Sequence, residues 1–184
     1  MPLTQVQGGI ILPSTTLTTP IVATTMGVGV ATPANSGSGI TFPATQSAST
    51  DANTLDDYEE GTWTPNVGGN ATYTGQLGVY VKIGILVYAS FDITVNVIGT
   101  GSTTTLSGFP FTSTGAGFPY TGSVSYFASI ATSVVFVSFY VQNSATSCLF
   151  TAGVTSGTTI TQNAFPIFGN SARVIGSVCY QSAS

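Results

Sequence analysis

The stretch ILVYASFDITVNV, residues 85–97, carries the clearest structural pattern in the sequence. Apolar side chains occupy every second position, and the positions between them include Ser90, Asp92 and Thr94. A period of two sustained over this length predicts a β-strand with one buried face. This strand indicates a β-fold for the surrounding chain.

The rest of the chain after Pro65 continues in the same pattern. A partner strand is predicted for residues 77–82, followed by a tight turn at Lys82-Ile83-Gly84. Breaks containing Gly or Pro separate further strands predicted at residues 102–106, 121–129, 133–142, 146–152, 158–161 and 172–181. Such spacing predicts an all-β domain, and we expect an antiparallel, jelly-roll-like β-sandwich head over residues 61–184.

Residues 1–60 differ in composition from the rest of the chain. They form the second predicted region, an extended N-terminal attachment arm that ends in an acidic junction. Prolines at positions 2, 13, 20, 33 and 43 interrupt regular structure. An arm of this kind gains order on a partner surface, and a disordered tail is the alternative. The candidate anchoring residues are Ile10, Ile11, Leu12, Ile21 and Val22.

Charge is scarce, because only 4% of the residues are charged and the formal net charge is -4. The chain has no histidine, which excludes Ser-His-Asp and Cys-His catalysis and histidine-ligated metal sites. Its two basic residues cannot neutralise a run of phosphates, so we expect no nucleic-acid partner. The apolar window 78–98 contains Lys82 and Asp92, so it indicates a strand and no membrane partner.

The acids gather in the segment DANTLDDYEE, residues 51–60, just before the single tryptophan. A solvated face is one interpretation, and pairing of Asp57 or Glu60 with Lys82 or Arg173 is another. The spacing does not fit a calcium loop, so no metal and no other cofactor is predicted. The candidate junction residues are Asp56, Asp57, Tyr58, Glu59, Glu60 and Trp63, with the Trp63 ring expected to be buried.

Four segments resemble one family. Residues 39–46 lead on to NTLDDYEEGTWTP at 53–65, and YVKIG at 80–84 and GFPF at 108–111 follow. Together they are similar to tailed-bacteriophage virion surface proteins of the head-decoration (cement) or tail-fibre type. The resemblance implies an exterior virion component, commonly a homotrimer, with an N-terminal attachment region and a β-rich head. The family pattern carries no catalytic residues.

The expected function is therefore structural and non-enzymatic. The chain is short for a tail fibre, which favours a capsid decoration protein made in the host cytoplasm and placed on the virion exterior. The alternative is a short tail-fibre tip that recognises a host surface glycan or protein. Expected partners are further copies of the chain and either the major capsid protein or tail components. Glycoside cleavage is disfavoured, because the predicted head retains only Asp92 as an acid.

Residues 133–141, SVVFVSFYV, are apolar on both faces and predict either a central strand or one that faces a neighbouring subunit. The candidate subunit-interface residues are Val135, Val137, Phe139 and Val141.

Two further sets of residues stand out. Phe118 and Tyr120 lie in a glycine-rich loop and are the candidate exposed contact. Cys148 and Cys179 are expected to be buried free thiols, unless their strands are neighbours that allow a disulfide.

Overall fold

The structure is a computed structural model, and it describes residues 25–34, 36–46, 49–51, 53–115, 117–154, 159–162 and 165–183. Every regular element within these residues is a β-strand. The chain divides into two compact units, residues 1–43 and 44–184. The division therefore falls earlier than the boundary expected at residue 60, and "head" below means residues 44–184.

The first unit contains a parallel pair of short strands, β1 (Thr25–Gly27) and β2 (Gly39–Thr41). The five candidate arm anchors lie outside the described residues: Ile10, Ile11, Leu12, Ile21 and Val22.

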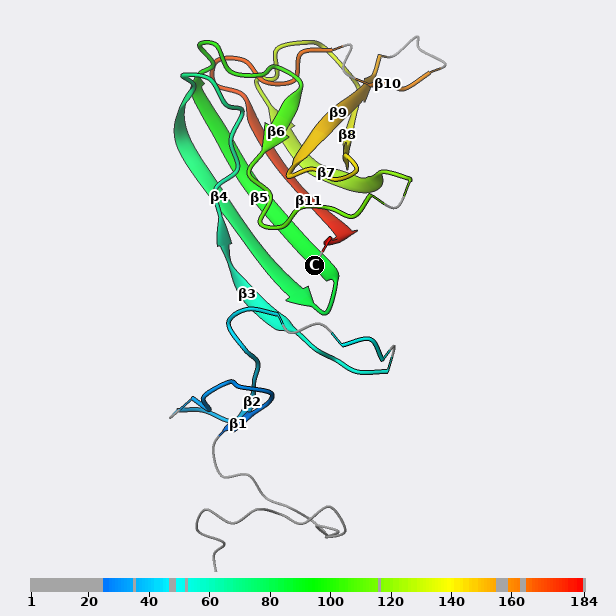
Figure 1. Cartoon of the computed structure of the whole chain (residues 1–184). Helices are drawn as coiled ribbons and strands as arrows, with labels where there is room; N and C mark the ends of the chain where they lie inside the picture. Colours follow the sequence, from blue (N-terminus) through cyan, green and yellow to red (C-terminus); the bar gives the residue numbers. More distant parts are fainter. Residues whose placement is uncertain are drawn as a thin grey trace, which may run out of the picture. The chain divides into compact units, whose positions relative to one another are not determined.

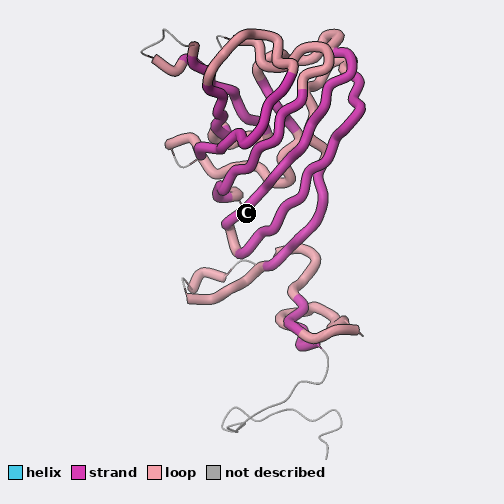
Figure 2. Tube along the Cα trace, turned by 180° about the vertical axis from the view of Figure 1, so that it is seen from behind, coloured by secondary structure: helices cyan, strands magenta, loops and turns pink. Residues whose placement is uncertain are grey.

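The head is built on one antiparallel sheet of nine strands, in the order β10-β9-β8-β7-β11-β5-β4-β3, with β6 paired to β9 (Figures 1 and 2). The strands are β3 (Tyr58–Trp63), β4 (Thr72–Ile83), β5 (Leu86–Val97), β6 (Thr105–Ser107), β7 (Tyr120–Ala128), β8 (Phe136–Val141), β9 (Ser147–Gly153), β10 (Thr161–Gln162) and β11 (Arg173–Gln181). The all-β, antiparallel prediction is confirmed.

The sheet curls until residues next to its two ends meet. Asn66, just after β3, forms an antiparallel bridge with Ser107 of β6. Beside this bridge the Trp63 ring stacks on Phe109, with ring centroids 4.8 Å apart. The layers of the predicted sandwich are therefore parts of one continuous sheet, and the core lies in its concave side.

Strand β5 follows the alternation seen in the sequence. Its inward residues are all nearly inaccessible to solvent: Val87, Ala89, Phe91, Ile93 and Val95. Ile85 does not belong to this face, because it lies in the turn and its side chain is 47% exposed. The turn itself is Gly84-Ile85, so Lys82 belongs to β4 and not to the turn. Gly84 has a φ of 57°, a left-handed conformation that glycine adopts without strain.

Glycines on the two middle strands make room for aromatic rings in the core. Phe91 of β5 and Phe139 of β8 have centroids 5.5 Å apart although β7 and β11 lie between their strands. A Cβ atom on Gly122 of β7 would lie 2.2 Å from the Phe139 ring. One on Gly176 of β11 would lie 2.9 Å from Phe91 and 3.0 Å from Phe139. The rings therefore cross backbone that carries no side chain.

The predicted subunit interface is wrong for three of its four residues. Val137, Phe139 and Val141 are at most 4% exposed within the single chain, because β8 has a neighbour on each side and packs into the curled core. Val135 alone is exposed. The central-strand alternative is thus the correct one.

We expect Gly122→Ala to destabilise the head by about 2 kcal/mol or more, because the new methyl group overlaps the Phe139 ring in a packed core. The matched control is Gly153→Ala in β9, where the nearest heavy atom lies 3.9 Å away. Urea unfolding curves of both variants measure the difference. Equal stabilities would contradict the packing described here.

Tyr180 makes the stability of the head depend on pH in the alkaline range. Its hydroxyl donates to the Phe111 carbonyl at 3.0 Å, and burial raises its pKa from the usual 10.0 to about 12. The unfolded chain loses the proton first, so this contribution is complete below pH 10 and is lost as pH rises to 12. Two pKa units correspond to about 2.7 kcal/mol. The free energy of unfolding of wild type should fall towards that of Tyr180→Phe by about 2.7 kcal/mol between pH 9 and 12. Unfolding curves of both proteins across this range measure the difference, and a constant difference would contradict the raised pKa of Tyr180.

Candidate assembly surface

The last residues of the acidic junction begin a strand. Residues 58–63 form β3, which pairs with β4 from Tyr58 opposite Ile83 to Trp63 opposite Gly78. Successive side chains of a strand point to opposite faces, so this short segment contributes to both sides of the sheet. DDYEEGTWTP and YVKIG, two of the segments that carry the family resemblance, are therefore neighbours in space.

On the inner face, glycine and aromatic residues alternate between the two strands. The Trp63 ring covers Gly78, and the Tyr80 ring covers Gly61. The Trp63 Nε1–H lies 3.3 Å from the Val79 carbonyl and 3.2 Å from the Ser90 carbonyl. The ring is 7% exposed, which confirms its predicted burial.

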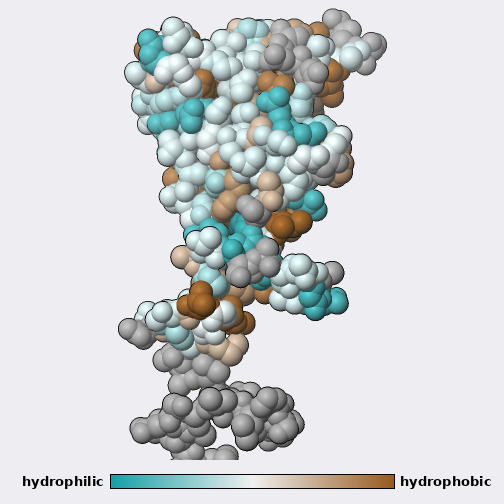
Figure 3. Space-filling model, viewed as in Figure 1, coloured by the Kyte–Doolittle hydropathy of each residue, from teal (hydrophilic) through white to brown (hydrophobic). Residues whose placement is uncertain are grey.

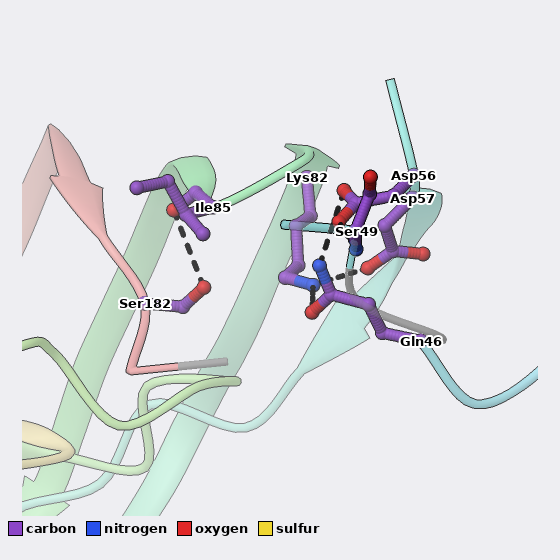
Figure 4. A network of polar contacts seen from close by, with 7 residues as sticks. All are labelled: Gln46, Ser49, Asp56, Asp57, Lys82, Ile85 and Ser182. Carbon is purple, nitrogen blue, oxygen red and sulfur yellow. Dashed lines mark hydrogen bonds and ion pairs between the residues drawn. The ribbon is translucent and has the colours of Figure 1, made fainter. Parts of the chain in front are cut away.

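Lys82 points into the same face and meets the acid that precedes β3 (Figure 4). Its Nζ forms an ion pair with Asp57 Oδ2, and the two side chains are 1% and 0% exposed. Nζ also donates to Gln46 Oε1 at 3.1 Å and lies 5.2 Å from the centre of the Phe111 ring. The predicted pairing of Asp57 with Lys82 is confirmed, and the solvated interpretation is wrong for Asp57.

The neighbouring acid Asp56 forms hydrogen bonds with Ser49 and Gln46 and not with Lys82. Its carboxylate accepts the Ser49 N–H at 2.8 Å and the Gln46 side-chain N–H at 3.3 Å. These hydrogen bonds, that of Ser49 foremost, lower the pKa of Asp56. Gln46 thus connects Asp56 to Lys82.

Glu60, Asp92 and Arg173 form contacts outside this cluster, whereas Glu59 lies next to it. Tyr58 donates to Glu60 at 2.9 Å, and this hydrogen bond raises the pKa of Tyr58. Arg173 pairs with Asp92 in an exposed two-point contact, so it does not bind the junction. Glu59 is half-buried and lies opposite Lys82 in the strand register.

The outer face of β3, β4 and β5 is unusually apolar for a solvent-exposed surface. The outer apolar face comprises six side chains, each between 42% and 61% exposed: Tyr58, Leu77, Val79, Ile83, Leu86 and Tyr88. Strand register places them in adjacent rows, with Ile83 between Tyr58 and Leu86. A contiguous exposed patch of this kind marks an interaction surface more often than an isolated apolar residue does.

The outer apolar face is also hollowed. One open hollow of about 420 Å³ is lined by residues of all three strands, among them Glu60, Val79 and Tyr88. A second, of about 180 Å³, lies beside it between Leu77, Asp92 and other side chains, and Val79 lines both. Elsewhere the visible surface of the head is mostly pale in Figure 3, the colour of residues with little hydropathy of either sign.

The sequence did not single out this face. Leu77 and Val79 belong to the predicted partner strand, but β4 carries apolar residues on both faces, and periodicity alone does not tell a buried face from an exposed one. Of the candidate exposed contacts, Phe118 is 58% exposed, whereas Tyr120 is 9% exposed and packs near Tyr180. The prediction is therefore wrong for Tyr120.

The two thiols differ. Cys148 is buried in the core, and burial raises its pKa, whereas Cys179 is exposed on β11. Both thiols are free, as expected. The expectation of burial is confirmed for Cys148 and wrong for Cys179.

Within the described residues there is no cluster of three or more potential metal ligands. No helix in this part of the chain has the length and apolarity needed to cross a membrane.

Comparison with known proteins finds a similar fold in one solved structure. No family model and no curated protein matches the sequence. The Dettilon tailspike protein (gp208) is similar in structure, with a TM-score of 0.52 and 16% sequence identity. The match covers 67% of this chain and 24% of the tailspike chain, so this chain spans about a quarter of that protein. At this identity the likeness shows that the two proteins share a fold over the matched region.

Proposed function

We propose that this chain is a non-enzymatic structural protein of the exterior of a tailed-phage virion, and that its copies associate as a homotrimer. Two observations support a phage origin. The NTLDDYEEGTWTP segment at 53–65 resembles phage virion surface proteins, and the fold is similar to part of a phage tailspike protein.

The outer apolar face is the observation that carries the assembly proposal. Interfaces of permanent homo-oligomers are more apolar than ordinary protein surface and poor in charge at their centre. The middle of this face holds Val79 and Tyr88, Ile83 lies at its end beside the turn, and Glu60 and Asp92 lie at its margins. Another copy of the chain fits this chemistry, because it would bring an equally uncharged surface to the contact.

The first candidate location is the capsid, where the protein would act as a decoration protein. The head beyond the junction carries only Lys82, Asp92 and Arg173 as charged residues, so copies repel one another little at long range. This suits many subunits crowded on one particle. The N-terminal residues 1–43 would attach the head to the major capsid protein.

The second candidate location is the tail, as a short fibre or receptor-binding protein. The fold similarity to a tailspike favours it. Exposed aromatic rings such as Phe118 could contact a host glycan or protein, since aromatic side chains combine an apolar face with rigid geometry. Inhibition of phage adsorption by the purified protein would support this location over the capsid.

We expect Val79→Asp to dissociate the trimer. The substitution places a charge in the middle of the outer apolar face, and assembly would have to bury that charge. The dissociation constant should rise about tenfold or more, the range expected for a central interface residue. Phe118→Asp is the matched control, because Phe118 is also an exposed apolar residue but lies in a loop outside the outer apolar face. Light scattering across a dilution series measures the mass, and a wild-type monomer at micromolar concentration would contradict the proposal.

Deletion of residues 1–43 should leave the head folded and abolish its incorporation into particles. The cut follows the boundary between the compact units, and it keeps Gln46, which binds Lys82. Circular dichroism reports the fold, and immunoblots of purified particles report incorporation. Normal incorporation would refute the attachment role, and immunogold labelling of the intact virion would assign the protein to the capsid or the tail.

A further inference from the structure

Lys82 and Asp57 form the buried one of the two ion pairs in the described part of the head. The side chains are 1% and 0% exposed, and the amine contacts one carboxyl oxygen directly. The second carboxyl oxygen of Asp57, Oδ1, is buried and accepts no hydrogen bond from the described residues. An ionised carboxylate left half unsatisfied in this way is costly, because burial removes the water that would solvate it.

The surroundings do not restore that solvation. The Phe111 ring lies over Nζ, and the Tyr80 ring packs edge-on against Phe111 with centroids 5.2 Å apart. Gln46 offers a single acceptor to the amine. Passing one proton along the Lys82–Asp57 hydrogen bond removes both buried charges and leaves a neutral amine against a neutral carboxylic acid. These are the two reactants of amide formation.

We propose that Lys82 and Asp57 condense into an intramolecular isopeptide bond that cross-links the start of β3 to the end of β4. The Lys82 Nζ lone pair attacks Asp57 Cγ, and a bond forms between Nζ and Cγ. The bond from Cγ to one carboxyl oxygen breaks, and that oxygen leaves as water with its own proton and one proton from Nζ. The other oxygen remains as the amide carbonyl, so the step needs no oxidant, reductant or further reactant.

The fold supplies the proximity that this reaction needs. Ladder hydrogen bonds of β3 and β4 fix both backbones, and the Gly84 N–H donates to the Asp57 carbonyl at 2.9 Å. Gln46 Oε1 holds the amine from another side, which makes Gln46 a positioning residue. Two groups held in contact react far faster than the same groups free in solution, because the entropy of bringing them together is already lost.

The product also suits the site better than the reactants do. A neutral amide replaces two groups that burial disfavours as ions, and its one carbonyl oxygen is cheaper to leave unpaired than a carboxylate oxygen. Exclusion of water from a pair with these exposures also protects the amide from hydrolysis. The inference concerns the head alone and does not depend on where the protein sits on a virion.

Trypsin provides a direct test, because the chain has only two cleavage sites, Lys82 and Arg173. Trypsin needs a free basic side chain, so an amide on Lys82 blocks the first site and leaves the second intact. The full-length protein, denatured before digestion, should be cut after Arg173 and resist cleavage after Lys82. Its intact mass should be lower than the sequence mass by one water molecule.

Two variants serve as controls. Asp57→Ala removes the electrophile, and Lys82→Arg keeps a cation and a trypsin site but forms no amide under these conditions. Both should be cut after position 82 and show the full sequence mass, whether or not they fold normally, because the digestion is done on denatured chains. Wild-type protein of unreduced mass, cut after Lys82 in as large a share of chains as after Arg173, would overturn the proposal.

Discussion

The curl of the sheet depends on the contact between Phe91 and Phe139 across two strands that carry glycine beneath the rings. A flat sheet would separate the two side chains by the three strand spacings from β8 to β5, which is about 14 Å. With no side chain on Gly122 or Gly176, the rings meet above bare backbone and the sheet closes around them. The Trp63–Phe109 stack and the Asn66–Ser107 bridge complete this closure.

Strands β3 and β4 also pack aromatic rings over glycine residues. Gly61 and Gly78 let the Tyr80 and Trp63 rings lie flat against β3 and β4, and the space at the end of this row is filled by Lys82. A lysine in this position needs an acid, and the chain supplies Asp57 one residue before the strand begins. Part of the acidic segment is thus required by packing, whereas Glu60 remains exposed.

Sequence analysis could predict the features that depend on one strand alone, such as the alternation of its buried and exposed residues. Strand β5 could be recognised because one of its faces is buried and the other meets water, which leaves a period of two. Strand β8 could not be assigned to core or interface, because apolar residues on both faces fit either environment and only the curl decides. The turn was predicted too early, at Lys82-Ile83-Gly84, although Lys82 alternates in phase with Gly78 and Tyr80 and continues β4.

The outer apolar face was beyond prediction for a related reason. Whether Leu77, Val79 and Tyr88 face the core or the solvent depends on which side of the sheet curls inward, and this is a property of the whole sheet. The pairing of Asp57 with Lys82 was one of several open alternatives. The register of β3 against β4 decides between them.

The distribution of ion pairs has a consequence for the conditions that the head tolerates. Dissolved salt weakens attractions between exposed charges and reaches buried ones far less. Of the two ion pairs in the described residues, Lys82–Asp57 is shielded from ions, and Arg173–Asp92 is an exposed contact of the kind that contributes little to stability. The stability of the head should therefore depend little on the salt concentration of the medium.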